Sequence, residues 1–270
     1  MLAATGGKVL AGGQSLVPIM SMRLAAPTDL VDINGLSDLD TVTVDAGRVR
    51  VGALARHTTV EHHREAYAAN PLLRRALQHV AHPTIRNRGT TVGSLVHADP
   101  AAEMPAVLCL LGGQVEALGP DGPRTIPSAE FFAGPLESSL ADDELAVAAI
   151  FPNPAAGSGT AWVEIARRHG DYGLVGVGAV VAVAAGVVAA ASVALISVGP
   201  VPVVVDVTPA VHGIHLSAAD WSQAAALVDA VIEPEADLHA SAEYRRHLAG
   251  VLVGQALRRA ADDAVSEDAA

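Results

Sequence analysis

Short apolar runs separated by turn residues fill the amino-terminal part of the chain. Apolar residues that alternate with polar ones predict strands, and apolar residues three or four apart predict helices. Glycine, proline and aspartate separate the two halves of each predicted hairpin. The pattern predicts strands at 8–11, 30–33, 41–44, 48–51, 114–118 and 124–126, with helices that begin near 60, resume over 72–80 and recur over 101–111.

A cluster of prolines and glycines over 151–160 predicts a boundary between two domains. Beyond it, apolar strands come first, and predicted helices over 218–232 and 241–261 follow them. Mixed elements before the boundary, and grouped strands then helices after it, predict an α+β protein with two domains. The domains are expected over 1–152 and 160–261, with a flexible acidic tail over 262–270.

Residues 173–205 contain no charged side chain and are numerous enough to cross a bilayer. They consist mainly of valine, alanine and glycine, whereas spanning helices favour leucine, isoleucine and phenylalanine. Gly186 lies midway, where it can turn one buried strand into the next. We therefore predict a buried β-hairpin or meander here and no membrane span.

Composition excludes several classes of function. The chain has 270 residues, is 51% hydrophobic and carries a formal net charge of −12. This charge repels nucleic acids and anionic lipids. Cys109 is the single cysteine, so this chain cannot form an internal disulfide, a zinc cage or an iron–sulfur cluster by itself. These features, and the absence of a visible secretion signal, predict a cytoplasmic protein.

The first motif with chemical potential follows the strand predicted at 8–11. It consists of Ala11, Gly12, Gly13, Gln14 and Ser15. Glycines allow a backbone to approach a ligand closely, and successive N–H groups in a turn can bind an anion. By itself, this motif could equally be an ordinary turn.

A second motif is found over 84–105, where glycines, hydroxyls and amides replace the apolar residues common elsewhere. This composition is typical of a loop that lines a polar ligand. A diphosphate needs donors on two sides, and the two motifs could supply them, while carboxylates could accept hydrogen bonds from sugar hydroxyls. The candidate ligand residues of this motif are Thr90, Thr91, Gly93, Ser94, His97, Asp99 and Glu103.

These two motifs, together with 167–172 and 243–246, resemble the FAD-binding medium subunit of molybdenum hydroxylases. Aerobic carbon monoxide dehydrogenase and the xanthine dehydrogenase group belong to this family. The resemblance implies an FAD-binding domain of the p-cresol methylhydroxylase type, with two α/β subdomains, followed by a domain of antiparallel strands and helices. It implies that residues 12–15 and 90–94 bind the FAD pyrophosphate through backbone amides, with Ala11 also at the cofactor. His97 and Glu103 would lie near FAD, and Tyr172 would cover its isoalloxazine ring.

The resemblance also implies an electron-transfer role. Substrate would be oxidised at a molybdenum cofactor on a large partner subunit, and 2Fe–2S clusters on a small partner would deliver electrons to FAD on this chain. An external acceptor would then take the electrons, and the complex would be a heterotrimer or its dimer. Two alternatives are a stand-alone flavin oxidoreductase of the same fold and a scaffold subunit that has lost FAD.

Two departures from the family pattern bear on FAD binding. Val92 replaces a glycine expected in the second motif, and a β-branched residue resists positive φ. The chain also begins almost at its first strand, which puts the stability of the first glycine motif in question. Five histidines, at 57, 62, 63, 79 and 82, show no convincing metal-binding pattern and are predicted to lie on the surface.

Overall fold

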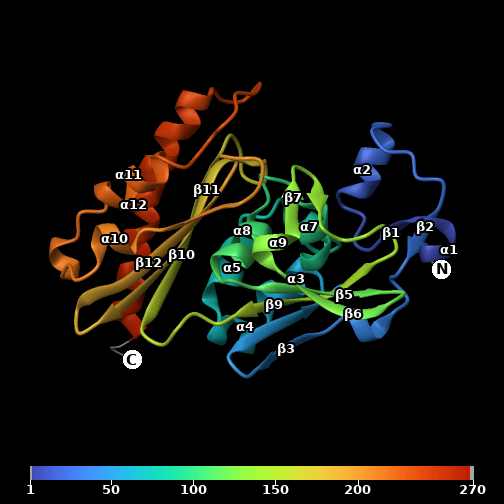
Figure 1. Ribbon diagram of the computed structural model, residues 1–270, viewed down its shortest axis with the longest axis horizontal. Coiled ribbons are helices and arrows are strands. Elements are labelled where there is room, and N and C mark those ends of the chain that lie inside the picture. Colours follow the sequence, from blue (N-terminus) through green and yellow to red (C-terminus); the bar gives the residue numbers. More distant parts are fainter. Residues whose placement is uncertain (1, 268–270) are drawn as a thin grey trace.

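The amino-terminal domain begins with a small parallel sheet. The structure is a computed structural model that describes residues 2–267 (Figure 1). Strand β1 (Lys8–Leu10) pairs with β2 (Leu30–Asp32) in parallel. Helix α1 (Leu2–Thr5) precedes β1, and α2 (Leu16–Ser21) connects the two strands. Because parallel strands end at the same edge, the segments that follow β1 and β2 come together there.

A second, antiparallel sheet forms the rest of this domain. Its strand order is β3-β4-β9-β5-β6. The hairpins predicted around residues 45–47 and 119–123 are confirmed. The strands are β3 (Val42–Asp45), β4 (Arg48–Gly52), β5 (Gln114–Gly119), β6 (Gly122–Pro127) and β9 (Leu145–Pro152), with a separate pair β7 (Phe132–Gly134) and β8 (Glu137–Ser138).

Short helices pack on this sheet and bury an aliphatic core that includes Leu72, Leu95 and Leu108. Helix α3 begins at His57, earlier than the start predicted near 60. The helices are η1 (Ser37–Leu39), α3 (His57–His62), α4 (Arg64–Ala69), α5 (Pro71–Leu77), α6 (Pro83–Arg86), α7 (Thr91–His97), α8 (Glu103–Leu110) and α9 (Ser128–Phe131).

The carboxy-terminal domain is an antiparallel meander covered by helices. Strands β10 (Ser158–Ala166), β11 (Gly173–Ala184), β12 (Val187–Ile196) and β13 (Val203–Asp206) pair in chain order. The uncharged segment therefore forms strands, as predicted, and β11 turns into β12 at Gly186. No helix within residues 2–267 is both long and apolar enough to span a bilayer. The helices are α10 (Thr208–Val211), η2 (Leu216–Ala218), α11 (Ser222–Asp229) and α12 (Ala242–Glu267).

Helix α12 packs on β10 and β11, while α5 and α8 of the first domain contact the same sheet from its other side (Figure 1). The approach of α12 is close at Gly159, where a Cβ atom would overlap the backbone of Ala260 and Ala264. The predicted flexible tail is partly wrong, because residues 262–267 continue α12. Within this extension, Asp263 bonds Arg75 of α5 and thereby ties the two domains together.

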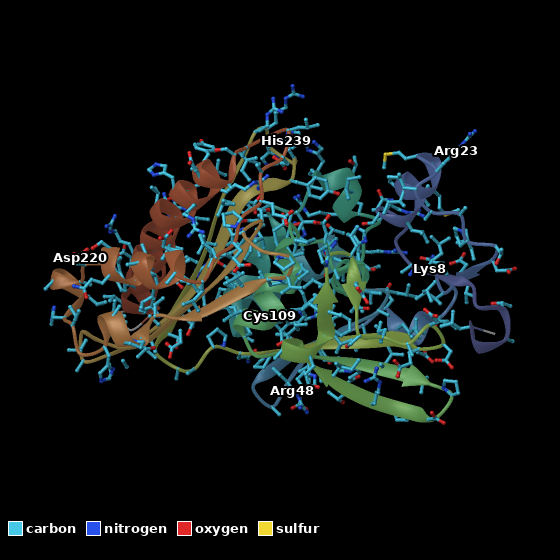
Figure 2. All side chains as sticks on the ribbon, turned by 45° about the horizontal axis from the view of Figure 1, so that its top comes forward. Lys8, Arg23, Arg48, Cys109, Asp220 and His239 are labelled. Atoms are coloured by element: carbon cyan, nitrogen blue, oxygen red, sulfur yellow. The ribbon has the colours of Figure 1, made fainter. Side chains whose placement is uncertain are left out.

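Side chains fill the layers between the two domains (Figure 2). Lys8 and Asp220 lie toward opposite ends of the molecule, and Cys109 lies between them. Each domain has its own aliphatic core, and Trp162 of β10 belongs to the core of the first domain. The carboxy-terminal sheet is therefore packed on both faces, which fixes the strand ends that reach the candidate site.

Candidate cofactor-binding site

The two glycine motifs lie against each other. A Cβ atom built on Gly12 would be 2.8 Å from the Gly89 Cα atom and 3.0 Å from the Thr90 backbone nitrogen. Real side chains essentially never approach backbone so closely, so only glycine allows this contact. The structure thus brings together two motifs that are more than seventy residues apart in the chain.

The first motif offers a row of unused donors. Within residues 2–267, no hydrogen bond uses the backbone N–H groups of Gly12, Gly13, Gln14 or Ser15. The Gln14 side chain donates to the Gly12 carbonyl at 3.3 Å, and this local hydrogen bond stabilises the turn. Unpaired backbone donors in succession need an oxygen-rich partner or water, and a phosphate group satisfies them well.

The second motif is a helix start and not the loop that its composition predicts. Thr90 precedes α7, and its side-chain oxygen accepts a hydrogen bond from the Gly93 N–H at 3.1 Å. The Thr91 hydroxyl lies 3.2 Å from His57 Nδ1. Both threonine hydroxyls are therefore engaged within the protein. In the described chain, the backbone N–H groups of Thr90 and Val92 have no protein acceptor, and they remain available to a ligand.

The expected difficulty at Val92 is not found. Val92 lies in α7, is absent from the residues with positive φ, and leaves only 2% of its surface exposed. Its side chain belongs to the aliphatic core of the first domain. Since the helical backbone here suits any residue, a valine does not obstruct the motif as the comparison with the family pattern suggested.

Two residues that sequence reasoning missed connect the motifs. The Asn34 side-chain amide donates to the Ala11 carbonyl at 2.8 Å. Arg56 donates through Nη2 to Asn34 Oδ1 at 2.7 Å, and through Nη1 to the Arg88 carbonyl at 2.6 Å. Asn34 follows β2 and Arg56 precedes α3, so neither belongs to a glycine-rich segment that would attract notice in the sequence.

Buried polar residues lie next to the second motif in the protein interior. His57 is buried, which corrects the prediction that it lies on the surface, and His79 is half-buried as well. Burial, and secondarily the Arg86 charge, lowers the pKa of His57 to about 4, so its ring is neutral near pH 7. Arg86 pairs with Glu61 at 2.9 Å, and both side chains are almost fully enclosed.

Acidic residues gather at the other end of the site. Glu103 leaves 8% of its surface exposed, and burial, followed by the nearby Glu164 and Asp99 carboxyls, raises its pKa well above the usual range. Tyr172 keeps 72% of its surface exposed, yet local desolvation and then the Asp99 and Glu103 carboxyls raise its pKa. The Asp99 and Glu103 carboxyls therefore lie within electrostatic reach of each other and of Tyr172.

His97 lies between the two ends of the site. Partial burial lowers its pKa, the Asp99 carboxylate acts in the opposite direction, and Lys8 of β1 lowers it further. His97, the last residue of α7, therefore lies within electrostatic reach of Lys8 and Asp99. Ser94 and Gly93, in the same helix, are partly exposed and lie between the unpaired donors and His97 along the chain.

Glu164 of β10 completes the acidic group and was missed in the sequence. Its Oε2 atom accepts a hydrogen bond from Trp162 Nε1 at 3.1 Å. Burial raises the pKa of Glu164 to about 7, although the Trp162 bond acts in the opposite direction. Backbone atoms of Gly173 and Gly176 lie close to this side chain. The carboxy-terminal domain thus contributes a second protonatable carboxyl beside Glu103.

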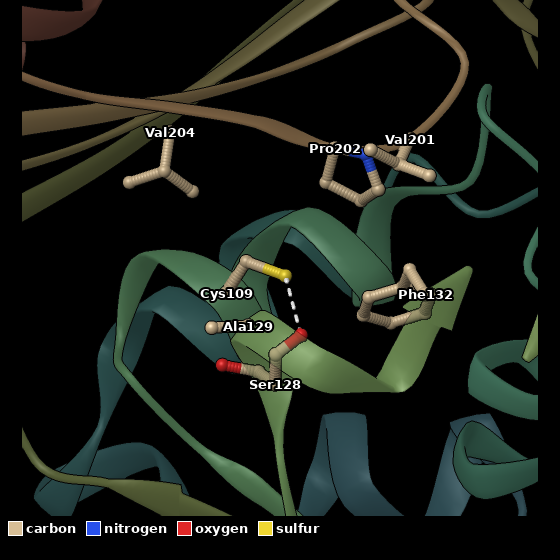
Figure 3. Close-up of a pocket in the computed structure, with 7 residues that line it drawn as sticks. All are labelled: Cys109, Ser128, Ala129, Phe132, Val201, Pro202 and Val204. Atoms are coloured by element: carbon tan, nitrogen blue, oxygen red, sulfur yellow. Dashed lines mark hydrogen bonds between the residues drawn. The ribbon is translucent and has the colours of Figure 1, made fainter. Parts of the chain in front are cut away.

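A separate cavity of about 330 Å³ lies between α8, α9 and the segment before β13 (Figure 3). Phe132, Val201, Pro202 and Val204 make its lining largely apolar. The Cys109 thiol donates to the Ser128 carbonyl at 3.8 Å, and burial raises the pKa of this thiol to about 12. A thiol in this state is neither a nucleophile nor a metal ligand near pH 7.

Comparisons with known proteins agree with this geometry. Residues 1–154 match the family described as the FAD binding domain in molybdopterin dehydrogenase, and residues 160–260 match the CO dehydrogenase flavoprotein C-terminal domain. The nicotine 6-hydroxylase medium subunit of Paenarthrobacter nicotinovorans is 37% identical over 247 residues, which are 91% of this chain and 87% of that protein.

The carbon monoxide dehydrogenase medium chain of Afipia carboxidovorans is 32% identical over 252 residues, which are 93% of this chain and 88% of that protein. Among solved structures, carbon monoxide dehydrogenase from Hydrogenophaga pseudoflava aligns with a TM-score of 0.90 at 32% identity, covering 96% of this chain and 91% of that one. Quinoline 2-oxidoreductase from Pseudomonas putida 86 aligns with a TM-score of 0.90 at 33% identity, covering 97% and 92%.

Proposed function

The chain belongs to the FAD-binding medium subunits of the molybdenum hydroxylases, and from this premise we propose that it conducts electrons, through FAD, from iron–sulfur clusters on a partner to an external acceptor. The observation that carries the proposal is the contact between two motifs in which the backbone N–H groups of residues 12–15, 90 and 92 have no protein acceptor within residues 2–267. FAD, when bound, supplies the electron chemistry. The residues of this chain bind it, orient it and control its surroundings.

The donor-rich end of the site suits the diphosphate of FAD. We assign this role to the backbone of Ala11, Gly12, Gly13, Gln14 and Ser15 on one side, and to the N–H group of Thr90 on the other. The N–H groups of Thr91, Gly93 and Ser94, which the sequence also proposed, already donate to the Ala55 carbonyl, to Thr90 Oγ1 and to the Thr90 carbonyl. The threonine hydroxyls are likewise engaged, by Gly93 and His57. The N–H of Val92 joins the N–H of Thr90 in this role, which the sequence did not predict.

The acceptor-rich end suits the sugar alcohol and the ring of FAD. Asp99, Glu103 and His97 can accept hydrogen bonds from hydroxyls or ring N–H groups, and Tyr172 can lay an aromatic face on the isoalloxazine. The raised pKa of Glu103 favours its protonated form, which can also donate a hydrogen bond. These side-chain roles are proposals that the position of each residue supports.

The proposal requires partner subunits. Cys109 is the single cysteine, and its thiol stays protonated, so the 2Fe–2S clusters must be held by another chain. Relatives named as medium subunits or medium chains imply companions of other sizes. We propose a small subunit with the iron–sulfur clusters and a large subunit with the molybdenum cofactor, in a heterotrimer or its dimer. The substrate pocket would lie on the large subunit.

The test is reconstitution of electron flow. The FAD-loaded chain should stay oxidised when it is mixed with the substrate of the complex alone, without any chemical reductant. Its visible flavin absorbance should decrease only when the small and large subunits are also present. Bleaching by substrate without partners would favour a stand-alone flavin oxidoreductase. A chain that joins the complex but retains no flavin would instead be a scaffold subunit, and the proposed electron path would be wrong.

A further inference from the structure

We propose that Asn34 and Arg56 form a clamp that holds the two glycine motifs at the separation required by one diphosphate. They are positioning residues, because they bond the backbone behind the motifs. This inference rests on the proposed function, since the diphosphate is that of FAD. It adds two residues that neither the glycine motifs nor the family resemblance indicated.

The clamp is a continuous chain of hydrogen bonds. It starts at the Ala11 carbonyl, passes through the Asn34 amide at 2.8 Å and continues to the Arg56 guanidinium at 2.7 Å. From there, Arg56 Nη1 reaches the Arg88 carbonyl at 2.6 Å, next to Gly89. Each end therefore holds a peptide carbonyl within a motif, while the N–H groups of Gly12 and Thr90 have no acceptor within residues 2–267.

The first motif needs such an external restraint. It follows β1 of a two-stranded sheet, and the helix α2 that continues from it has no buried residue. The second motif belongs to the large core through Val92 and Leu95. Without a link, the peripheral motif could shift relative to the anchored one, and binding a diphosphate would cost the entropy of fixing it.

Asp32 keeps Asn34 in the required orientation. Its Oδ1 atom accepts from the Asn34 backbone N–H at 2.9 Å and from the side-chain amide at 2.6 Å. The same two bonds, the backbone one first, lower the pKa of Asp32, so it remains ionised. The Asn34 amide nitrogen is thus directed at Ala11 and Asp32 while its oxygen faces Arg56. Both the nitrogen and the oxygen of the Asn34 amide are therefore hydrogen-bonded.

The charge of Arg56 strengthens the site for an anion. No ion pair among residues 2–267 includes Arg56, whose bonds go to a carbonyl and an amide oxygen. The positive charge of Arg56 is therefore not neutralised by direct contact with a carboxylate. In a chain of net charge −12, a guanidinium that contacts no carboxylate directly and bonds Asn34 and the Arg88 carbonyl favours a diphosphate there.

The test separates the clamp from general stability by using parts of the cofactor. Flavin-free full-length chain is titrated calorimetrically with FAD, with ADP, which contains the diphosphate, and with riboflavin, which lacks it. Arg56→Ala and Asn34→Ala should weaken FAD and ADP by a similar factor, about tenfold or more, and leave riboflavin unaffected. Arg56→Lys, which keeps the charge but not the two-pronged geometry, should fall between Arg56→Ala and wild type.

The matched control is Arg50→Ala, which removes an arginine that pairs with Glu116 on the five-stranded sheet, away from both motifs. This control should bind FAD and ADP as wild type does. The thermal unfolding midpoint of each flavin-free variant shows whether it folds.

If wild type binds FAD, and the clamp variants bind FAD and ADP as tightly as wild type does, the clamp is wrong while the proposed function stands. If riboflavin binding falls as much as ADP binding, the effect is general and the clamp is again wrong. If wild type binds no FAD, both proposals are overturned.

Discussion

Glu103, which is buried, and Glu164, which is partly buried, are two carboxyls that impose a pH dependence on the protein. The pKa of Glu164 rises from an ordinary value of 4.5 to about 7 because the side chain is buried. Glu103, whose pKa is also raised, lies close enough for each negative charge to oppose the other. Below the ordinary pKa, both carboxyls are neutral whether the chain is folded or unfolded, so burial then costs little.

Above the ordinary pKa, the sign of the effect is unfavourable to the fold. Between about pH 4.5 and pH 7, Glu164 ionises in the unfolded chain but stays protonated in the folded one, so stability falls as pH rises. We predict that Glu164→Gln raises the free energy of unfolding by roughly 1–3 kcal/mol at about pH 8 and by little at about pH 4.5. Urea unfolding of the flavin-free chain at both pH values measures this difference.

The control is Glu235→Gln, which removes an exposed carboxylate of the loop before α12. It should change stability equally at both pH values. A stabilisation of Glu164→Gln that is independent of pH would contradict the shifted pKa and point to a packing effect. Glutamine can still accept the Trp162 hydrogen bond, so that bond is not the variable.

At the residue scale, the sequence indicated the glycine motifs but not the side chains that hold them in place. Gly12 and Gly13 stand out locally, because adjacent glycines after a strand permit either a tight turn or a close approach of the backbone to a ligand. Asn34, Arg56 and Glu164 do not stand out, since each depends on partners that are distant in the chain. Val92 was misjudged because the motif was expected to be a loop, whereas Thr90 caps a helix there.

At the scale of elements, the last turns of α12 connect the two domains. Asp263 accepts from both guanidinium nitrogens of Arg75, at 2.6 and 2.5 Å, and from the Thr160 backbone N–H at 2.9 Å. Both charged side chains are largely enclosed. We predict that Asp263→Asn lowers the free energy of unfolding by about 1–3 kcal/mol, because an amide cannot accept this pair of bonds and Arg75 stays buried.

Asp229→Asn provides the comparison within the same domain. Asp229 pairs with Arg246, but both side chains are well exposed, so its loss should cost about 0–1 kcal/mol. Chemical denaturation of the two variants under identical conditions gives the contrast. Equal losses would mean that Asp263 is no more than a surface charge and that α12 is held by its apolar face alone.

Periodicity predicted most strands because their pairing partners are near in sequence. The hairpins of β3 with β4, β5 with β6, and β11 with β12 all follow this rule. The end of α12 did not follow from its composition, which is acidic and rich in small residues. Because Ala260 and Ala264 are small, α12 can pack closely on the backbone at Gly159. This contact joins residues far apart in the chain, so local sequence patterns do not predict it.

At the scale of the whole molecule, the site is made where separate parts meet. The small parallel sheet is followed by the first motif, and the large core holds the second. The carboxy-terminal domain supplies Glu164 of β10 and Tyr172 of the loop before β11. The family resemblance predicted this division, whereas hydrophobic periodicity alone predicted only an α+β protein with two domains. The relative placement of the parts depends on contacts such as the Arg75–Asp263 pair, which involve residues far apart in sequence.

The most direct test is titration of flavin-free chain with FAD, comparing wild type with Gly12→Ala and with Gly35→Ala. Wild type should bind about one FAD per chain with saturation. A methyl group on Gly12 would meet Gly89 and Thr90 and separate the motifs, so Gly12→Ala should weaken FAD binding at least about tenfold, whereas Gly35→Ala, with open space around it, should not. Absence of saturable FAD binding by wild type, or undiminished binding by Gly12→Ala, would contradict the claim that these two motifs hold the cofactor.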